Sequence, residues 1–399
     1  MGKNAAAIAG LTEWKPARVW DRPLFNMEAM AQLASELIAD TGLEKGEIDG
    51  LVIAGTQESP MLAPSAVAEY LGVRSRFNER VDIGGASPAG MVWRAAAAIE
   101  VGVCESVLVL CPGTPQPPEH GDIANGKMVM PPYLFGETWG SPQGQFEIPA
   151  GLVAATPSYA MLAQRYMATY ELDEETLAKV AVHARHNAQS NPDAIFYGKP
   201  ITIDDVMSSR VVADPLKLLE VVMPCFGGAG VLVTSLERAS RATHRPAIVS
   251  GFGEELTHKS LTYMPDLLDS PVRGAAERAF KMAGTKPSKI DMAALYDCYT
   301  ITVLLTLEDA GFCKKGQGAA FIREHDLRHD GNDFPVNTGG GQLGGGQAGL
   351  AAGLSHVTEA VRQIQGRAGM RQLENCDLTF VNGNGGMMSE QVSLVLEGA

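Results

Sequence analysis

The sequence predicts an α/β fold built from two copies of one β-α-β-α-β-α-β unit. Apolar runs of strand length alternate with helical periodicity up to about residue 111, and the same order of elements returns after residue 239. A glycine-rich turn lies between the third strand and the third helix of each copy, at Gly84–Ser87 and at Gly339–Gly349. Alternation of this kind predicts a parallel or mixed sheet with helices on its faces.

The first copy is expected to contain four strands and three helices. Short apolar runs predict strands at Ala5–Gly10, Ile48–Gly55, Arg80–Ile83 and Ser106–Cys111. Apolar residues at helical spacing predict helices at Met27–Asp40, Ser65–Leu71 and Ala89–Val101.

The composition changes between about Pro112 and Pro200. Proline, glycine and aromatic residues gather first, and two helical stretches follow, Ser158–Tyr170 and Glu174–Ser190. We interpret residues 112–200 as an insertion over the sheet. Strands at Val211–Pro215 and Ala229–Ser235 then complete the first half, so we expect an N-terminal half at 1–240 and a C-terminal half at 241–399.

The second copy repeats the order of the first. Its expected strands are Ala247–Gly251, Ile290–Asp297, Pro335–Asn337, Leu378–Val381 and Gln391–Leu396. Its expected helices are Val272–Gly284, Thr300–Gly311 and a third that follows the glycine run and ends near Gly366. If the two copies face each other, both glycine turns open into one cleft.

Composition excludes several classes of protein. A net charge of −14 without a basic stripe argues against a nucleic-acid partner. No apolar run approaches the ~18 residues of a membrane span, and the N-terminus does not resemble a signal peptide. The six cysteines are scattered without a CxxC pair, which predicts reduced thiols in a cytoplasmic protein.

The stretch Asn337–Gly353, NTGGGQLGGGQAGLAAG, has the composition of backbone that approaches a ligand closely. It contains GxGxxG twice. However, the next expected strand ends at Val381-Asn382 without the acidic residue of a dinucleotide site, and no Gly-Lys-Ser/Thr of a P-loop follows. We therefore expect no tightly bound cofactor.

Several motifs, taken in order, resemble those of the thiolase superfamily. They are Gly84–Ser87 before an alanine-rich helix, His186-Asn187-Ala188, Ser209-Arg210, Tyr296–Tyr299, Asn337–Gly353 and Asn382–Gly386. The chain is most similar to sterol-carrier-protein-x-type thiolases and their thiolase-like relatives, including bacterial steroid side-chain aldolases. The resemblance implies a five-layered α-β-α-β-α core with a loop-domain insertion, and a homodimer.

The residues expected to perform thiolase chemistry are altered. By the resemblance, the nucleophilic cysteine position falls on Gly85, the activating histidine on Gln347, and the second cysteine on Asn382. Tyr296 stands where a histidine or asparagine opens the remaining motif. Because glutamine cannot act as a base at neutral pH, we expect chemistry that does not depend on cysteine.

Retro-aldol cleavage of a β-hydroxyacyl-CoA fits this altered site. Backbone oxyanion pockets at Gly84–Ser87 and Asn382–Gly386 would stabilise a thioester enolate. Tyr296 would act as the acid/base if its site depressed its pKa. The steroid side-chain aldolases resemble this chain in using tyrosines, although a second tyrosine of that group would fall on Gln347. Coenzyme A enters only as part of the substrate.

The remaining candidates contact substrate or stay structural. Gln347 and Asn382 are catalytic candidates that would hydrogen-bond a carbonyl or a water. The expected substrate-binding residues are Gly85, Ser87, Tyr299, Gly346, Gly385 and Gly386, although Ser87 also suits a helix N-cap and Tyr299 a structural position. Four aromatic residues of the insertion would line a hydrophobic acyl pocket or pack within the loop: Tyr133, Phe135, Trp139 and Phe146.

The histidines do not predict a metal site. His325 and His329 have i, i+4 spacing, but no third ligand is evident, so a solvated loop is the preferred interpretation. His183 and His186 lie in a charged helix and are interpreted as surface or packing residues.

Two other functions stay open. One is a Claisen-type thiolase or acyltransferase acting on an unusual β-ketoacyl-CoA, such as an aryl one, which would require free CoA. The other is a non-catalytic subunit that binds acyl-CoA or lipid. The resemblance also implies a small partner with a zinc ribbon and an OB-fold, in a heterotetramer.

Overall fold

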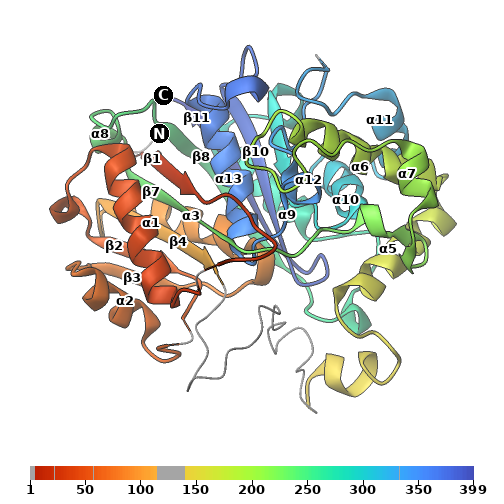
Figure 1. Cartoon of the computed structure of the whole chain (residues 1–399), viewed down its shortest axis with the longest axis horizontal. Coiled ribbons are helices and arrows are strands. Elements are labelled where there is room, and N and C mark those ends of the chain that lie inside the picture. The colour runs from red at the N-terminus through yellow and green to blue at the C-terminus, as the bar shows by residue number, and fades with distance from the viewer. Residues whose placement is uncertain (1–4, 22, 57, 115–139, 332) are drawn as a thin grey trace.

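A nine-stranded sheet runs through the molecule (Figure 1). The structure, a computed structural model, describes residues 5–21, 23–56, 58–114, 140–331 and 333–399. The strand order is β3-β2-β4-β7-β1-β8-β11-β10-β9. The strands are β1 (Ala6–Glu13), β2 (Gly50–Ile53), β3 (Phe77–Arg80), β4 (Ser106–Gly113), β7 (Gly227–Ser235), β8 (Ala247–Leu256), β9 (Met292–Leu295), β10 (Leu378–Gly385) and β11 (Glu390–Gly398).

The sheet confirms the predicted duplication. From its centre outward, β1-β7-β4-β2 in one half matches β8-β11-β10-β9 in the other. In each series the first two pairings are antiparallel and the last is parallel. The halves join where β1 pairs with β8, Ala7 lying opposite Ile248. The edge strand β3 has no full strand as its counterpart in the described part of the second half. A single parallel bridge, between Ala293 and Val336, takes that place.

The two halves of the sheet and the helices around and between them form five layers. Helices α1 (Asn26–Thr41) and α2 (Ala63–Leu71) cover the outer face of the N-terminal half. Helices α9 (Val272–Ala283) and α10 (Thr300–Asp309) cover the outer face of the C-terminal half. Between the halves lie α3 (Ser87–Glu100) and α13 (Ala351–Ile364), each in contact with strands of both halves.

Strands covered on both faces have apolar side chains throughout. On β4, Val107 and Val109 point to the layer of α3 and α13, while Leu108 and Leu110 point to α1. Successive side chains of a strand face opposite sides, so a continuous apolar run fits a strand buried on both faces. This is why the run Ser106–Cys111 predicted a strand correctly.

The segment between β4 and β7 stands outside the main sheet. Its described part contains α5 (Ala155–Thr169), α6 (Glu174–Ala188), α7 (Ile203–Ser208) and a hairpin of β5 (Val211–Ala213) with β6 (Leu216–Lys217). Helix α6 packs against α10, α11 (Gly318–Glu324) and α12 (Gly341–Gly345), and α8 (Leu236–Ala239) follows β7. The division of the chain into halves at 1–240 and 241–399 stays a prediction.

One strand prediction was misplaced. We expected Arg80–Ile83, but β3 is Phe77–Arg80, paired in parallel with Gly50–Ile53. The Val81 N–H still donates to the Ile53 carbonyl, and after Val81 the chain leaves the sheet and turns toward α3. In the described part of the chain no helix is both long and apolar enough to cross a membrane.

Candidate active site

Two glycine turns, one from each half, touch through their backbones. The turn Gly84–Ala86 precedes α3, and Gly385 ends β10 and is followed by Gly386. Gly84 has φ +58, and a Cβ atom there would lie 3.1 Å from the Gly386 nitrogen and 3.2 Å from the Gly385 Cα. Glycine is therefore needed at position 84 both for its backbone angle and for close approach.

Tyr296 occupies the space in front of Gly85. A Cβ atom added at Gly85 would overlap the Tyr296 hydroxyl and lie 2.5 Å from both its Cζ and the Asn384 carbonyl oxygen. The Tyr296 side chain is only 6% exposed, whereas Gly85 is half-buried. The absence of a side chain at position 85 thus makes room for the tyrosine hydroxyl.

The end of β9 fixes the position of Tyr296. Its N–H donates to the Asn382 carbonyl at 3.0 Å. The Asn337 side chain accepts from the Leu295 N–H at 2.8 Å and donates to the Leu295 carbonyl at 2.9 Å. On the other side, the Asp297 carboxylate accepts the N–H groups of Gln342 and Leu343 at 2.7 and 3.2 Å. Tyr296 is thus held between two anchored neighbours.

Gln347 completes the surroundings of the phenol. Its Nε2 donates to the Tyr296 hydroxyl oxygen at 3.3 Å. The backbone around it is extended because the Gln347 N–H bonds Met223 and its carbonyl accepts from Cys225, both at 2.9 Å. Gly346 and Ala348 consequently face the other way, since neighbouring side chains of an extended segment alternate.

The N-terminal ends of α3 and α13 meet at the same place. A Cβ atom at Gly353 would lie 2.6 Å from the Gly85 carbonyl oxygen and 3.0 Å from Pro88. Each helix has 14 residues, and helix N-termini carry partial positive charge. Two such ends beside one hydroxyl favour an anion that develops there.

Burial keeps the phenol protonated. Loss of solvent raises the pKa of Tyr296 above its ordinary value, and the Gln347 hydrogen bond offsets this only in part. The condition stated for Tyr296 as an acid/base, a depressed pKa, is therefore not met in this arrangement. Nearby, burial raises the pKa of Asp297 to about 7 and lowers the pKa of His356 to about 3.

Behind the turns lies a buried network that includes Asn382. Its Nδ2 donates to Gln391 at 2.9 Å, and its Oδ1 accepts from Ser393 at 2.9 Å. The Gln391 amide donates to Asn384 at 2.7 Å, and Asn384 donates to the Tyr159 hydroxyl at 2.8 Å. Asn384 and Gln391 were not singled out from the sequence; the polar residue inside the turn GNGG was the available signal.

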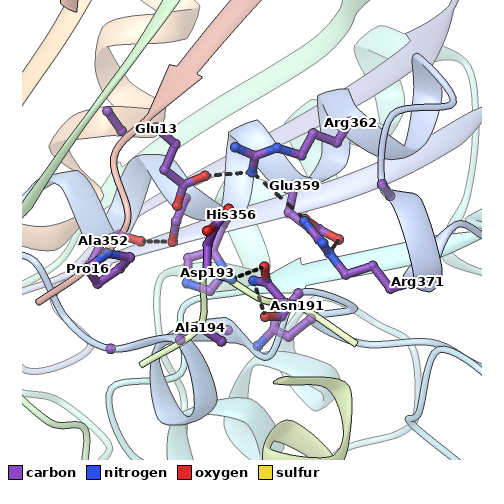
Figure 2. A pocket seen from close by; sticks show the side chains of 18 of the residues that line it. Glu13, Pro16, Asn191, Asp193, Ala194, Ala352, His356, Glu359, Arg362 and Arg371 are labelled. Atoms are coloured by element: carbon purple, nitrogen blue, oxygen red, sulfur yellow. Dashed lines mark hydrogen bonds and ion pairs between the residues drawn. The ribbon is translucent and has the colours of Figure 1, made fainter. Parts of the chain in front are cut away.

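A separate pocket of about 350 Å³ has Gly346 and Ala348 of the glycine run in its lining. Figure 2 shows this pocket from close by. Four of its charged residues form two ion pairs: Arg362 lies 2.6 Å from Glu13, and Arg371 lies 2.8 Å from Glu359. Tyr296, Gln347 and Asn382 are not among the residues that line it in the described part of the chain. We therefore place the candidate chemistry at the tyrosine and not in this pocket.

Comparison with known proteins identifies the family. Residues 253–398 match the family described as Thiolase C-terminal domain-like. A steroid side-chain-cleaving aldolase of Thermomonospora curvata is 33% identical over 369 residues, which cover 91% of each chain. The chain belongs to the thiolase superfamily. Within it, the chain is similar to this aldolase and, at 30% identity over 55% of its length, to a sterol carrier protein 2 of Oryctolagus cuniculus, of which it covers 41%.

The names of other relatives of this thiolase-superfamily chain include both a lyase and an acetyltransferase. A 17-hydroxy-3-oxo-4-pregnene-20-carboxyl-CoA lyase of Mycobacterium tuberculosis is 30% identical, covering 92% of this chain and 93% of the relative. An acetyl-CoA acetyltransferase of Methanothermobacter thermautotrophicus is also 30% identical, with 95% and 96% covered. A solved structure of an Ltp2-ChsH2(DUF35) aldolase is 30% identical, with a TM-score of 0.85 and coverage of 99% and 98%.

None of the six cysteines of this thiolase-like chain lies in surroundings that favour the thiolate form. All six cysteines are free, and burial raises the pKa of each thiol to about 12. A thiolate is the nucleophilic form of cysteine, and the raised pKa values keep these thiols protonated near neutral pH. Cys298, two residues after Tyr296, receives a weak contact from Asn384 at 3.8 Å.

The other predicted residues are distributed around the turns. Tyr299 is buried, stacks on Tyr159 with ring centres 4.4 Å apart and bonds Thr156 at 2.8 Å. Ser87 is the first residue of α3, and the N-cap position belongs to Ala86. The Ser87 hydroxyl instead accepts the Ile83 N–H at 2.9 Å and braces the turn.

Of the four aromatic residues predicted to line an acyl pocket, three lie outside the described residues: Tyr133, Phe135 and Trp139. Phe146 is described and is 53% exposed, in a short helical turn at Gln143–Glu147.

Proposed function

We propose that this chain is an acyl-CoA aldolase that breaks the Cα–Cβ bond of a β-hydroxyacyl-CoA by a retro-aldol reaction. The observation that carries the proposal is the Tyr296 hydroxyl, which fills the space beside Gly85 where a nucleophilic side chain would otherwise project. The aldolase and CoA-lyase names of full-length relatives support the same reaction class.

In this mechanism Tyr296 relays a proton in one concerted step. As the Cα–Cβ bond breaks, its electrons move to Cα, with negative charge shared by the thioester oxygen, and the phenol gives its own proton to Cα. In the same step the β-hydroxyl gives its proton to the phenol oxygen, and the former alcohol carbon becomes a ketone or aldehyde. The products are the carbonyl compound and the shortened acyl-CoA, and Tyr296 is neutral before and after the step. A phenol whose pKa is raised suits this shuttle, because the resting state need not be a phenolate.

The backbone and Gln347 support that step. The N-terminal ends of α3 and α13, with the turns Gly84–Ser87 and Asn382–Gly386, stabilise the negative charge that develops on the thioester oxygen. Gln347 orients the phenol through its 3.3 Å hydrogen bond. Asn382, whose side-chain amide is already bonded within the buried network, keeps the end of β10 in place.

Five of the predicted substrate-binding residues would serve at this point. Gly85, Gly385 and Gly386 would offer backbone to the substrate, and Ser87 and Tyr299 would hold the surrounding segments in place. Gly346 faces the separate pocket instead. Coenzyme A is part of the substrate, and the mechanism uses no bound cofactor. A steroid-like acyl group is suggested by the relatives' names alone.

Cleavage in the absence of free CoA tests the reaction class. We expect a β-hydroxyacyl-CoA to be split into a carbonyl compound and a shorter acyl-CoA, and added CoA to leave the rate unchanged. Liquid chromatography with mass spectrometry follows both products. An absolute requirement for free CoA would instead show a thiolase, and no turnover of any acyl-CoA by an assembled complex would show a binding subunit.

We further propose that the chain works as a homodimer in the cytoplasm, joined to a small partner that carries a zinc ribbon and an OB-fold. The similar Ltp2-ChsH2(DUF35) aldolase supports a second protein component, since its name includes ChsH2(DUF35). Co-purification with a DUF35 protein of the same genome, followed by light scattering of the complex, tests this assembly. A monomer that is fully active alone would contradict it.

A further inference from the structure

Three side chains that can bind a metal converge where α6 ends. They are His186, on the last turn of α6, and His329 and Asp330, in the loop after α11. Their ligand atoms all lie within 4.8 Å of one another, and no other group of three or more His, Cys, Asp or Glu in the described chain meets that criterion. The site lies at the surface, with Asp330 exposed and both histidines half-buried.

Asn187 fixes the orientation of the His329 ring. The Asn187 Nδ2 donates to the carbonyls of Val336 and Asn337 at 2.9 and 3.2 Å, which fixes the amide so that its Oδ1 faces His329. That oxygen lies 3.1 Å from the His329 Nδ1, so Nδ1 must carry the proton and donate. The His329 Nε2 is left with its lone pair, as in metal-bound histidines whose other nitrogen donates to an oxygen.

His186 and Asp330 are the other two members of the group. The His186 Nε2 lies 3.0 Å from both carboxylate oxygens of Asp330, and the imidazole rings of His186 and His329 are 5.7 Å apart. Two imidazoles and one carboxylate form a ligand set typical of zinc and similar divalent ions.

We propose that His186, His329 and Asp330 bind a divalent transition-metal ion, Zn²⁺ above all, with water at the remaining position. The sequence suggested no metal site because it offered His325 as the neighbour of His329. The structure instead pairs His325 with Asp333 at 2.9 Å and brings in His186 from a distant helix.

Such an ion would hold α6 to the loop that leads into the glycine run. Asn187 already bonds the carbonyls of Val336 and Asn337, and Asn337 clamps Leu295 next to Tyr296. The role is therefore structural: the metal secures the strand end that positions the phenol. The site stands independently of the proposed reaction.

Metal binding to the purified, chelator-treated full chain tests this site. We expect Zn²⁺ titrated by calorimetry to bind at one site per chain and to raise the thermal unfolding midpoint, and Co²⁺ to give visible d–d absorption. H329A and H186A should each weaken Zn²⁺ binding at least tenfold and remove the thermal shift. H325A, a histidine-to-alanine change in the same loop, should match the wild type.

Either of two results would overturn the proposal. One is wild-type affinity no tighter than that of H329A; the other is an equal loss of affinity in H325A. If H329A unfolds when metal-free, Asp330→Asn replaces it, because the exposed carboxylate can be neutralised without disturbing buried contacts. Failure of the aldolase assay would leave these binding results unaffected.

Discussion

Tyr296→Phe should lower kcat for β-hydroxyacyl-CoA cleavage by about 10²–10⁴-fold, the usual contribution of a positioned acid/base group. The substitution keeps the aromatic ring that fills the space before Gly85 and removes only the hydroxyl that carries the proton. The thermal midpoint and KM should therefore change little. Steady-state kinetics and a melting curve on the same preparation measure both.

Tyr166→Phe is a matched control for this variant. Tyr166, like Tyr296, is a buried tyrosine, but its hydroxyl bonds Glu308 in the layer outside the site. Its loss should reduce stability and leave kcat within a few-fold of wild type. More than a tenth of wild-type kcat in Tyr296→Phe would remove the tyrosine from the mechanism.

The pH profile separates a neutral phenol from a phenolate base. Because burial raises the pKa of Tyr296 above its usual value near 10, the phenol stays protonated across the neutral and mildly alkaline range. We expect kcat/KM to show no rise that depends on Tyr296 between about pH 7 and 9. A limb that rises with pH in the wild type and vanishes in Tyr296→Phe would indicate a phenolate base.

Gly85→Ala should destabilise the protein by about 1–3 kcal/mol, the cost of overpacking a close-packed site, and should also inactivate it. The new methyl group would overlap the Tyr296 hydroxyl and the Asn384 carbonyl oxygen, and the latter belongs to the backbone. Denaturant unfolding measures the loss. Gly46→Ala is the control, because a Cβ atom there meets nothing within 4 Å, and it should change stability by less than about 0.5 kcal/mol.

A double variant tests whether the contact is direct. Adding Gly85→Ala to Tyr296→Ala should cost less than adding it to the wild type, because the overlap with the tyrosine has gone. Strict additivity of the two losses would contradict the packing described for this pair.

The fold was predictable because its signals are local and repeated. Strands such as β4 are marked by continuous apolar runs, and the same order of elements occurs twice. The third strand of the second copy, expected at Pro335–Asn337, was harder to predict. Only Val336 forms a bridge there, and no local sequence pattern distinguishes one bridge from a short strand.

The site was predictable in its residues more than in its electrostatics. Tyr296 and Gln347 do meet, and they meet beside Gly85. The pKa of Tyr296, however, is raised through burial by segments distant in sequence, and the sequence could give a depressed pKa only as a condition. The partners of Asn382 and of His329 likewise come from other elements, β11 and α6, which spacing along the chain cannot reveal.

Intact-protein mass spectrometry during turnover tests the central claim that the chemistry needs no cysteine. The enzyme, in complex with its partner if required, is mixed with a β-hydroxyacyl-CoA and quenched in acid while product is forming. The account predicts an unmodified chain at every time point alongside accumulating carbonyl product. An acyl adduct that forms and decays at the rate of turnover, mapped to any of the six cysteines, would contradict it.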